Sequence, residues 1–162
     1  MAQKIVGVMG AGEKATTKDT ALAYQLGQAI AQNNWILLTG GRNTGVMDAA
    51  SRGAKAAGGL VVGVLPGNSK AGVSEAVDIA IATDLGNGRN NVNVLSSDLV
   101  IACGMGCGTA SETALALKNQ QPVILLAQTK LTEQFFQSLA PDLVLIAQNL
   151  AEAIALCKEI LD

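Results

Sequence analysis

Residues 99–109 read LVIACGMGCGT, a run of five apolar residues that leads directly into a glycine-rich turn. A continuous apolar run of this length, without polar alternation, is typical of a strand that helices cover on both faces of its sheet. Beyond the turn, Ala110, Ala114 and Leu117 recur at the spacing of one helix face. The stretch therefore predicts a buried strand, a tight turn and a helix in direct succession.

Apolar runs of strand length alternate with helical patterns along the whole chain. These runs are residues 5–9, 35–38, 60–65, 77–82, 99–103, 123–127 and 143–147. Such alternation predicts an α/β fold with an open, mainly parallel, doubly wound sheet flanked by helices, as in Rossmann-like proteins. Because no change of composition and no long linker interrupts the pattern, we expect a single domain over residues 1–162.

The composition excludes several classes of function. The 162 residues are 49% hydrophobic and 15% charged, which is unlike an intrinsically disordered chain. The absence of histidine excludes Ser-His-Asp and Cys-His catalytic triads and histidine-ligated zinc. A net charge of −2 with eleven basic residues argues against nucleic acid as a partner.

The cysteines and the apolar runs indicate in which cellular compartment the protein is found. Cys103, Cys107 and Cys157 form no CxxC pair, so we predict neither a disulfide framework nor a metal site, and we expect Cys103 and Cys157 to be buried. The amino terminus lacks the apolar segment of a signal peptide, and no run reaches the roughly 18–20 apolar residues of a membrane helix. We therefore expect a cytoplasmic protein with no membrane partner.

Three strand runs lead into glycine-rich turns, at residues 10–12, 40–45 and 104–109. Ligands of such folds bind beyond the carboxyl ends of the strands, where backbone N–H groups and helix N-termini attract anions. The simpler interpretation is that these glycines only make tight turns. We predict a site for an anionic small molecule, formed by Gly10, Ala11, Gly12, Gly40, Gly41, Arg42, Gly45, Met105, Gly106, Cys107, Gly108 and Thr109.

Common nucleotide motifs fit these turns poorly. Gly10-Ala11-Gly12 is followed by Ala15 where a dinucleotide fingerprint accepts Gly or Ala, but the second strand ends in Thr39-Gly40-Gly41 without an acidic residue for a ribose. The chain also contains no P-loop sequence and no G-x-S-x-G elbow. NAD, P-loop nucleotide hydrolysis and serine-hydrolase chemistry are therefore disfavoured.

The few charged residues near the turns are candidates for ligand contact. Arg42 lies in the second turn, and Arg89 begins a helical stretch before the strand at residues 99–103. Arg52, by contrast, is expected on the outer surface of a helix. Glu112 follows Thr109 at capping-box spacing, so it either caps the helix or faces a ligand, and the local pattern favours capping.

Together these residues resemble a known superfamily. Gly40-Gly41-Arg42-x-x-Gly45-Val46-Met47, Arg89-Asn90, Asp98 and Gly106-x-Gly108-Thr109-x-x-Glu112 are similar to motifs of the LONELY GUY phosphoribohydrolases, often labelled lysine decarboxylase-like. Within that superfamily the sequence most resembles the molybdenum cofactor carrier proteins. The resemblance implies a Rossmann-like fold that binds, stores and protects the molybdenum cofactor, a molybdopterin with a terminal phosphate.

The resemblance also implies roles for particular residues. The N–H groups of residues 106–109 would hold phosphate or molybdate oxygens, Arg42 would neutralise charge, and residues 10–12 would line the cleft. It further implies a homo-oligomer, either a dimer or a tetramer, with molybdoenzymes or cofactor-synthesis proteins as possible partners.

An enzymatic alternative remains open at this point. The phosphoribohydrolase motif PGGxGTxxE corresponds here to Gly104-Met105-Gly106-Cys107-Gly108-Thr109-Ala110-Ser111-Glu112, and the hydrolases' lysine after the arginine is replaced by Asn90. In that alternative, Arg89 and Glu112 would be catalytic in cleaving the N-glycosidic bond of a nucleoside monophosphate. A nucleotide-sensing module that uses the same cleft without turnover is a third hypothesis.

Overall fold

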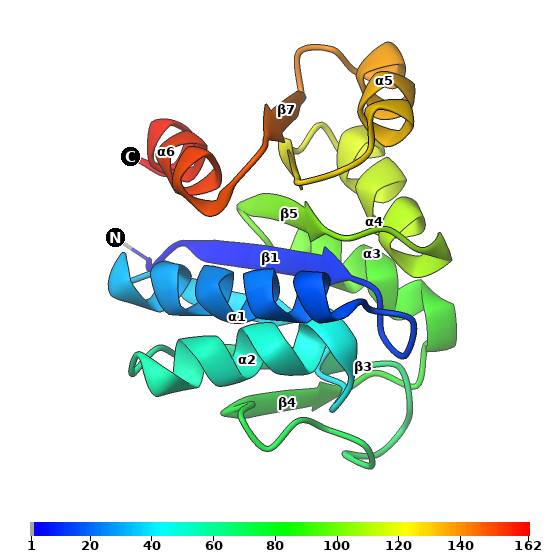
Figure 1. The fold of residues 1–162 in the computed structure, drawn as a ribbon. Helices are drawn as coiled ribbons and strands as arrows, with labels where there is room; N and C mark the ends of the chain where they lie inside the picture. The colour runs from blue at the N-terminus through cyan, green and yellow to red at the C-terminus, as the bar shows by residue number, and fades with distance from the viewer. Residues whose placement is uncertain (1) are drawn as a thin grey trace.

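The computed structural model describes residues 2–162, which contain a seven-stranded sheet in the order β4-β3-β2-β1-β5-β6-β7 (Figure 1). The strands are β1 (Ile5–Gly10), β2 (Ile36–Thr39), β3 (Val61–Leu65), β4 (Ile79–Ala82), β5 (Leu99–Cys103), β6 (Val123–Leu126) and β7 (Val144–Ala147). The helices are α1 (Thr17–Gln32), α2 (Gly45–Ala56), α3 (Arg89–Leu95), α4 (Cys107–Lys118), α5 (Lys130–Leu139) and α6 (Leu150–Leu161), with a 3-10 turn η1 (Gly86–Gly88) before α3.

Every neighbouring pair in the sheet is parallel, so the predicted doubly wound α/β fold is confirmed. The chain moves outward from β1 to β4, then returns through η1 and α3 to β5 on the other side of β1. The direction of winding therefore reverses between β1 and β5, and open sheets bind ligands at the carboxyl ends of the strands beside such a reversal.

All seven apolar runs form strands, with small differences at their ends. The run at 77–82 predicted a longer strand than β4, which begins at Ile79. Val77 lies in a turn instead, because its N–H donates to the carbonyl of Ser74 at 3.1 Å rather than to a neighbouring strand. An apolar side chain can therefore pack on the core without its backbone joining the sheet.

Two apolar layers explain why the strands are continuously apolar. α1, α2 and α6 pack on one face of the sheet, and α3, α4 and α5 contribute to the core on the other. Along β1, Val8 faces the first layer and Met9 the second. Cys103 and Cys157 are buried as expected. No helix within residues 2–162 combines the length and the apolarity needed to cross a membrane.

α1 and α2 lie side by side in front of the sheet, in very close contact (Figure 1). Glycine makes this contact possible on both helices. A methyl group at Gly27 would overlap the main-chain carbonyl of Ala50, and one at Gly53 would overlap that of Tyr24. This packing brings the turns before the two helices together, so that the N–H of Val46 donates to the carbonyl of Ala11 at 3.0 Å.

Replacing Gly53 with alanine should lower the melting temperature, because the added methyl must push α2 away from α1. Overpacking costs about 1–3 kcal/mol or more, which exceeds the roughly 1 kcal/mol that alanine contributes through helix propensity. Thermal unfolding followed by circular dichroism measures the difference. Gly67→Ala is the matched control, because no heavy atom lies within 4 Å of a methyl group placed there. Equal melting temperatures for Gly53→Ala and the unsubstituted chain would contradict the close contact.

Candidate functional site

A cleft of about 440 Å³ lies beyond the carboxyl ends of β1, β2 and β5. All three predicted glycine turns reach its walls. The sequence-predicted residues that line it are Gly10, Ala11, Gly12, Gly40, Arg42, Arg89, Gly106, Cys107, Gly108, Thr109 and Glu112. Segments that are distant in the sequence are therefore brought together at the reversal point of the sheet.

α4 begins at this cleft without a cap. Its N-cap residue is Gly106, in extended conformation, and no side chain accepts a hydrogen bond from the first turn. The first bond of the helix runs from the N–H of Ala110 to the carbonyl of Gly106 at 2.8 Å. The N–H groups of Cys107, Gly108 and Thr109 meet no acceptor among the described residues. Three free donors together with the positive end of the helix dipole are able to hold an anion.

The space around this helix start suits a ligand. No heavy atom lies within 4 Å of a methyl group placed at Gly106 or Gly108, so these glycines face open space. Thr109 is only 2% exposed, and its hydroxyl oxygen has no hydrogen-bond partner among residues 2–162. A buried hydroxyl without a partner is uncommon, because desolvation is costly. An anion at the start of α4 is a suitable partner for it.

The capping interpretation of Glu112 is wrong. The helix starts at Cys107, three residues earlier than the Thr109-x-x-Glu112 pattern indicates, so Thr109 lies inside the first turn. Glu112 instead lines the cleft at 7% exposure, and the side-chain amide of Asn93 donates to its Oε1 at 2.9 Å. Burial raises the pKa of the Glu112 carboxyl, while the Asn93 hydrogen bond and the charge of Arg89 oppose that rise.

Arg89 is held by main-chain carbonyls at the ends of two strands. Its Nη1 donates to the carbonyls of Gly40 at 2.6 Å and Val64 at 2.7 Å, and its Nε donates to Oδ1 of Asn90 at 3.0 Å. Burial lowers the pKa of the guanidinium; Glu112 raises it and Arg42 lowers it. Nη2 donates to no described residue, so one edge of a positioned guanidinium remains available to the cleft.

Arg42 and Arg52 lie in the contrasting environments that the sequence predicts. Arg42 lines the cleft, with its side chain 46% exposed and a loose ion pair of 3.7 Å to Glu13. Arg52 lies on the outer surface of α2, where its Nε donates to Asp48 at 2.7 Å. Because Arg42 and Arg89 are close enough to repel each other, this side of the cleft favours an anionic ligand.

Three predicted site residues do not line the cleft. Gly41 packs against Gly63 with a φ of +76°, and Gly45 lies with a φ of +56° where any side chain would overlap the carbonyls of the first turn. Met105 packs on the second apolar layer. The shared reason is that a glycine-rich turn must also pack against its neighbours, so only part of it can face a ligand.

Sequence reasoning also missed part of the site. The other lining residues are Val8, Met9, Glu13, Lys14, Met47, Asn87 and Asn90. Glu13 and Lys14 directly follow the first predicted turn, which was a usable signal. Asp98 lies at the opposite end of the sheet, where its carboxylate accepts the N–H of Ile5 at 2.8 Å, so it supports the sheet and not the cleft.

Glu112→Gln should stabilise the chain at neutral pH. Because burial raises the folded-state pKa of Glu112, ionisation costs stability above that pKa, and the cost disappears below the ordinary carboxyl range. Glutamine keeps an oxygen for the Asn93 hydrogen bond but carries no charge. We expect a higher melting temperature near pH 7, where 1 kcal/mol corresponds to roughly 2–4 °C, and a difference that closes toward pH 4.

Differential scanning fluorimetry across this pH range makes the comparison. Glu159→Gln is the control, because Glu159 is exposed on α6. A Glu112→Gln variant less stable than the unsubstituted chain at pH 7 would show that attraction to Arg89 outweighs the desolvation of the carboxylate.

The chain is similar in sequence and fold to several known proteins. The molybdenum cofactor binding protein of Rippkaea orientalis is 58% identical, with a TM-score of 0.98 over 100% of this chain and 99% of the other. The molybdenum cofactor carrier protein of Chlamydomonas reinhardtii is 50% identical, with a TM-score of 0.95 over 99% of each chain. An uncharacterized protein of Archaeoglobus fulgidus is 46% identical over 75% of this chain and 78% of its own length. Residues 3–154 match the SLOG cluster4 family, and the chain belongs to that family.

Proposed function

We propose that this chain binds the molybdenum cofactor in the cleft and acts as its carrier. The observation that carries the proposal is the start of α4, where three main-chain N–H groups and the Thr109 hydroxyl have no acceptor or partner among the described residues. The proteins of Rippkaea orientalis and Chlamydomonas reinhardtii, which match almost the whole chain at 58% and 50% identity, are named as binding or carrying this cofactor.

In this proposal the start of α4 receives an anionic end of the cofactor, either its phosphate or its molybdate oxygens. Arg42 and the free edge of Arg89 supply positive charge in the lining of the same cleft. Lys14 lines the cleft as well, so three of the eleven basic residues contribute positive charge there although the chain carries a net charge of −2. Binding and shielding require no proton transfer, so the lack of histidine is no obstacle.

Phosphoribohydrolase activity is the second candidate, because Arg89 and Glu112 line the same cleft. The arrangement of Arg89 favours the carrier. Three of its N–H donors are already directed at Gly40, Val64 and Asn90, which suits a fixed charge better than a group that follows a changing substrate. Met105, where the hydrolase motif has glycine, packs on the core and does not line the cleft.

Oligomerisation, cytoplasmic location and exchange with molybdoenzymes or cofactor-synthesis proteins remain predictions. The buried apolar faces of α2 and α4 pack on the sheet and are therefore not free for association. The exposed apolar side chains of α5, which are Leu131, Phe135 and Leu139, support a homo-oligomer better. Sedimentation of the purified chain distinguishes a monomer from a dimer or tetramer.

Gly108→Asp should weaken cofactor retention strongly while the chain stays folded. The side chain fits, because a methyl group at this position meets no atom within 4 Å, and a carboxylate in the first turn stabilises a helix. The same charge repels an anion at the start of α4. We expect retention to fall roughly tenfold or more, the equivalent of about 1.4 kcal/mol.

Retention is measured by incubating each protein with molybdenum cofactor and then reconstituting a cofactor-free nitrate reductase. Gly67→Asp is the control, since it adds the same charge at an open position away from the cleft. The proposed function fails if the folded, unsubstituted chain does not prolong the lifetime of the cofactor.

Incubation with AMP distinguishes the carrier from the hydrolase. We expect no adenine above the protein-free blank when products are separated by chromatography. Adenine release that disappears in Glu112→Ala would establish the hydrolase instead, because that carboxylate lies at the cleft.

A further inference from the structure

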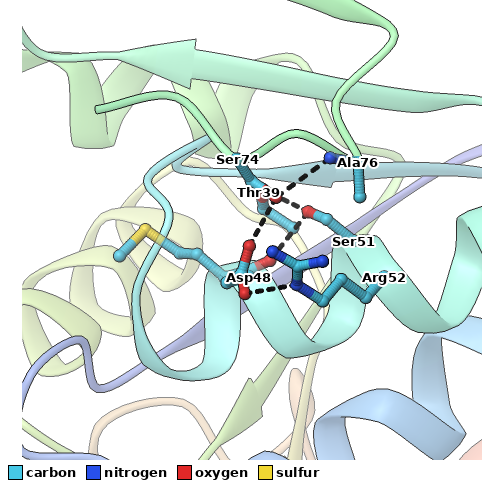
Figure 2. A network of polar contacts seen from close by, with 7 residues as sticks. Thr39, Asp48, Ser51, Arg52, Ser74 and Ala76 are labelled. Atoms are coloured by element: carbon cyan, nitrogen blue, oxygen red, sulfur yellow. Dashed lines mark hydrogen bonds and ion pairs between the residues drawn. The ribbon is translucent and has the colours of Figure 1, made fainter. Parts of the chain in front are cut away.

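A polar network lies outside the cleft, between α2 and the loop that joins β3 to β4 (Figure 2). Figure 2 shows Asp48 at its centre, between Ser74 and Arg52. The Ser74 hydroxyl donates to Oδ1 of Asp48 at 2.6 Å, and Nε of Arg52 donates to Oδ2 at 2.7 Å. None of these three residues lines the cleft, so the carrier site does not account for the network.

The two bonds to Asp48 differ in their surroundings. Ser74 is 1% exposed and donates to a carboxylate whose side chain is 20% exposed, so loss of this largely buried bond is costly. The Arg52 side chain is 51% exposed, and ion pairs at such positions contribute little. The contact between Ser74 and Asp48 is therefore the one that holds the β3–β4 loop to the start of α2.

The same loop holds the backbone on both sides of Arg42. The N–H of Ser74 donates to the carbonyl of Gly41, and the N–H of Asn43 donates to the carbonyl of Gly72, both at 2.9 Å. Arg42 and Val73 pair in an isolated antiparallel bridge. A short segment of the loop thus forms a ladder along the turn that carries Arg42.

A second anchor reaches this turn from the core. The N–H of Gly41 donates to the Thr39 hydroxyl at 3.0 Å, and that hydroxyl lies 3.5 Å from the hydroxyl of Ser51. Both Thr39 and Ser51 are fully buried. The peptide groups around Arg42 are therefore fixed from two directions, although the Arg42 side chain has only its loose ion pair with Glu13.

We propose that Ser74 and Asp48 are positioning residues for Arg42, which they hold at the cleft through the β3–β4 loop. This rests on the proposed function in so far as Arg42 contacts the cofactor. A long side chain that makes one weak contact can point toward a ligand reproducibly only if its backbone is fixed. Fixing it before binding reduces the entropy lost on binding, and so increases affinity without any added contact.

The rest of the loop does not depend on this contact. β4 stays paired with β3 from Ile79 to Ala82 through its own ladder. Asp78, just before β4, is bound by Lys55 and by the N–H of Val61. Removal of the Ser74 hydroxyl should therefore release the segment around residues 72–74 and leave the sheet intact.

A double-mutant cycle tests the proposal. The variants are Ser74→Ala, Arg42→Ala and the two combined, with retention measured as the rate of cofactor loss from loaded protein. We expect Ser74→Ala to accelerate loss about threefold to tenfold. In the Arg42→Ala background the same substitution should add nothing, because the side chain through which it acts is gone.

Native-state amide exchange reports on the positioning itself and needs no cofactor. The N–H of Asn43, which donates to Gly72, should exchange several-fold faster in Ser74→Ala and in Asp48→Ala. Asp48→Asn keeps an oxygen for the Ser74 hydroxyl and should restore slow exchange. Arg52→Ala is the matched control, because it removes only the exposed partner of Asp48.

Two results would overturn the proposal: unchanged exchange at Asn43 in Ser74→Ala, or equal effects of Ser74→Ala on retention with and without Arg42. If the unsubstituted chain fails to retain cofactor, the proposed function is wrong, while the exchange of Asn43 still decides whether Ser74 and Asp48 hold this turn.

Discussion

The first three N–H groups of α4 have no acceptor among the described residues, and the cleft is arranged around them. Four other helices begin differently. Side-chain oxygens of Thr16, Thr129 and Asn149 cap α1, α5 and α6, and the carbonyl of Ala11 accepts from the start of α2. Because unpaired donors are costly unless water or a ligand satisfies them, the open start of α4 leaves donors for a partner at the cleft.

Charged side chains lie in the same cleft as the free N–H donors of α4. Arg89 is held by the carbonyls of Gly40 and Val64, while Arg42 is held by its backbone and by a loose ion pair with Glu13. Buried Glu112 limits the net positive charge that the two guanidinium groups produce. A cleft of fixed charges and main-chain donors can hold an anionic cargo with little reorganisation, which is what storage and later release require.

Close packing between α1 and α2 has a consequence at the same cleft. Gly27 and Gly53 allow the two helices to approach until side chains no longer separate their backbones. The turns that precede these helices are thereby pressed together, so that Gly45 lies against the carbonyls of the first turn. The first and second turns can then act as one wall, although about thirty residues of helix and strand separate them along the chain.

Two local patterns have a different role in the structure from the one that the sequence indicates, and the physical reason is shared. The Thr109-x-x-Glu112 spacing is a sound local signal for a helix start, but Asn93 of α3 binds Glu112 and the helix begins earlier. Likewise, Gly41 and Gly45 resemble ligand-facing glycines in the sequence, yet both are needed for packing. The same local pattern at a helix start or a glycine turn can serve more than one structural role. Contacts with a neighbouring segment decide which role it has.

Local sequence accounts for the succession of strands and helices along the chain, for the three glycine turns and for the α/β class. The reason is that apolar periodicity and glycine content act within a few residues. The tertiary structure alone decides which turn residues face the cleft and how Arg42 is held there. The contact between Ser74 and Asp48 spans 26 residues, and the contact of Arg89 with Gly40 spans 49. No local pattern specifies such pairs, because they form only when the sheet brings the ends of separate strands together.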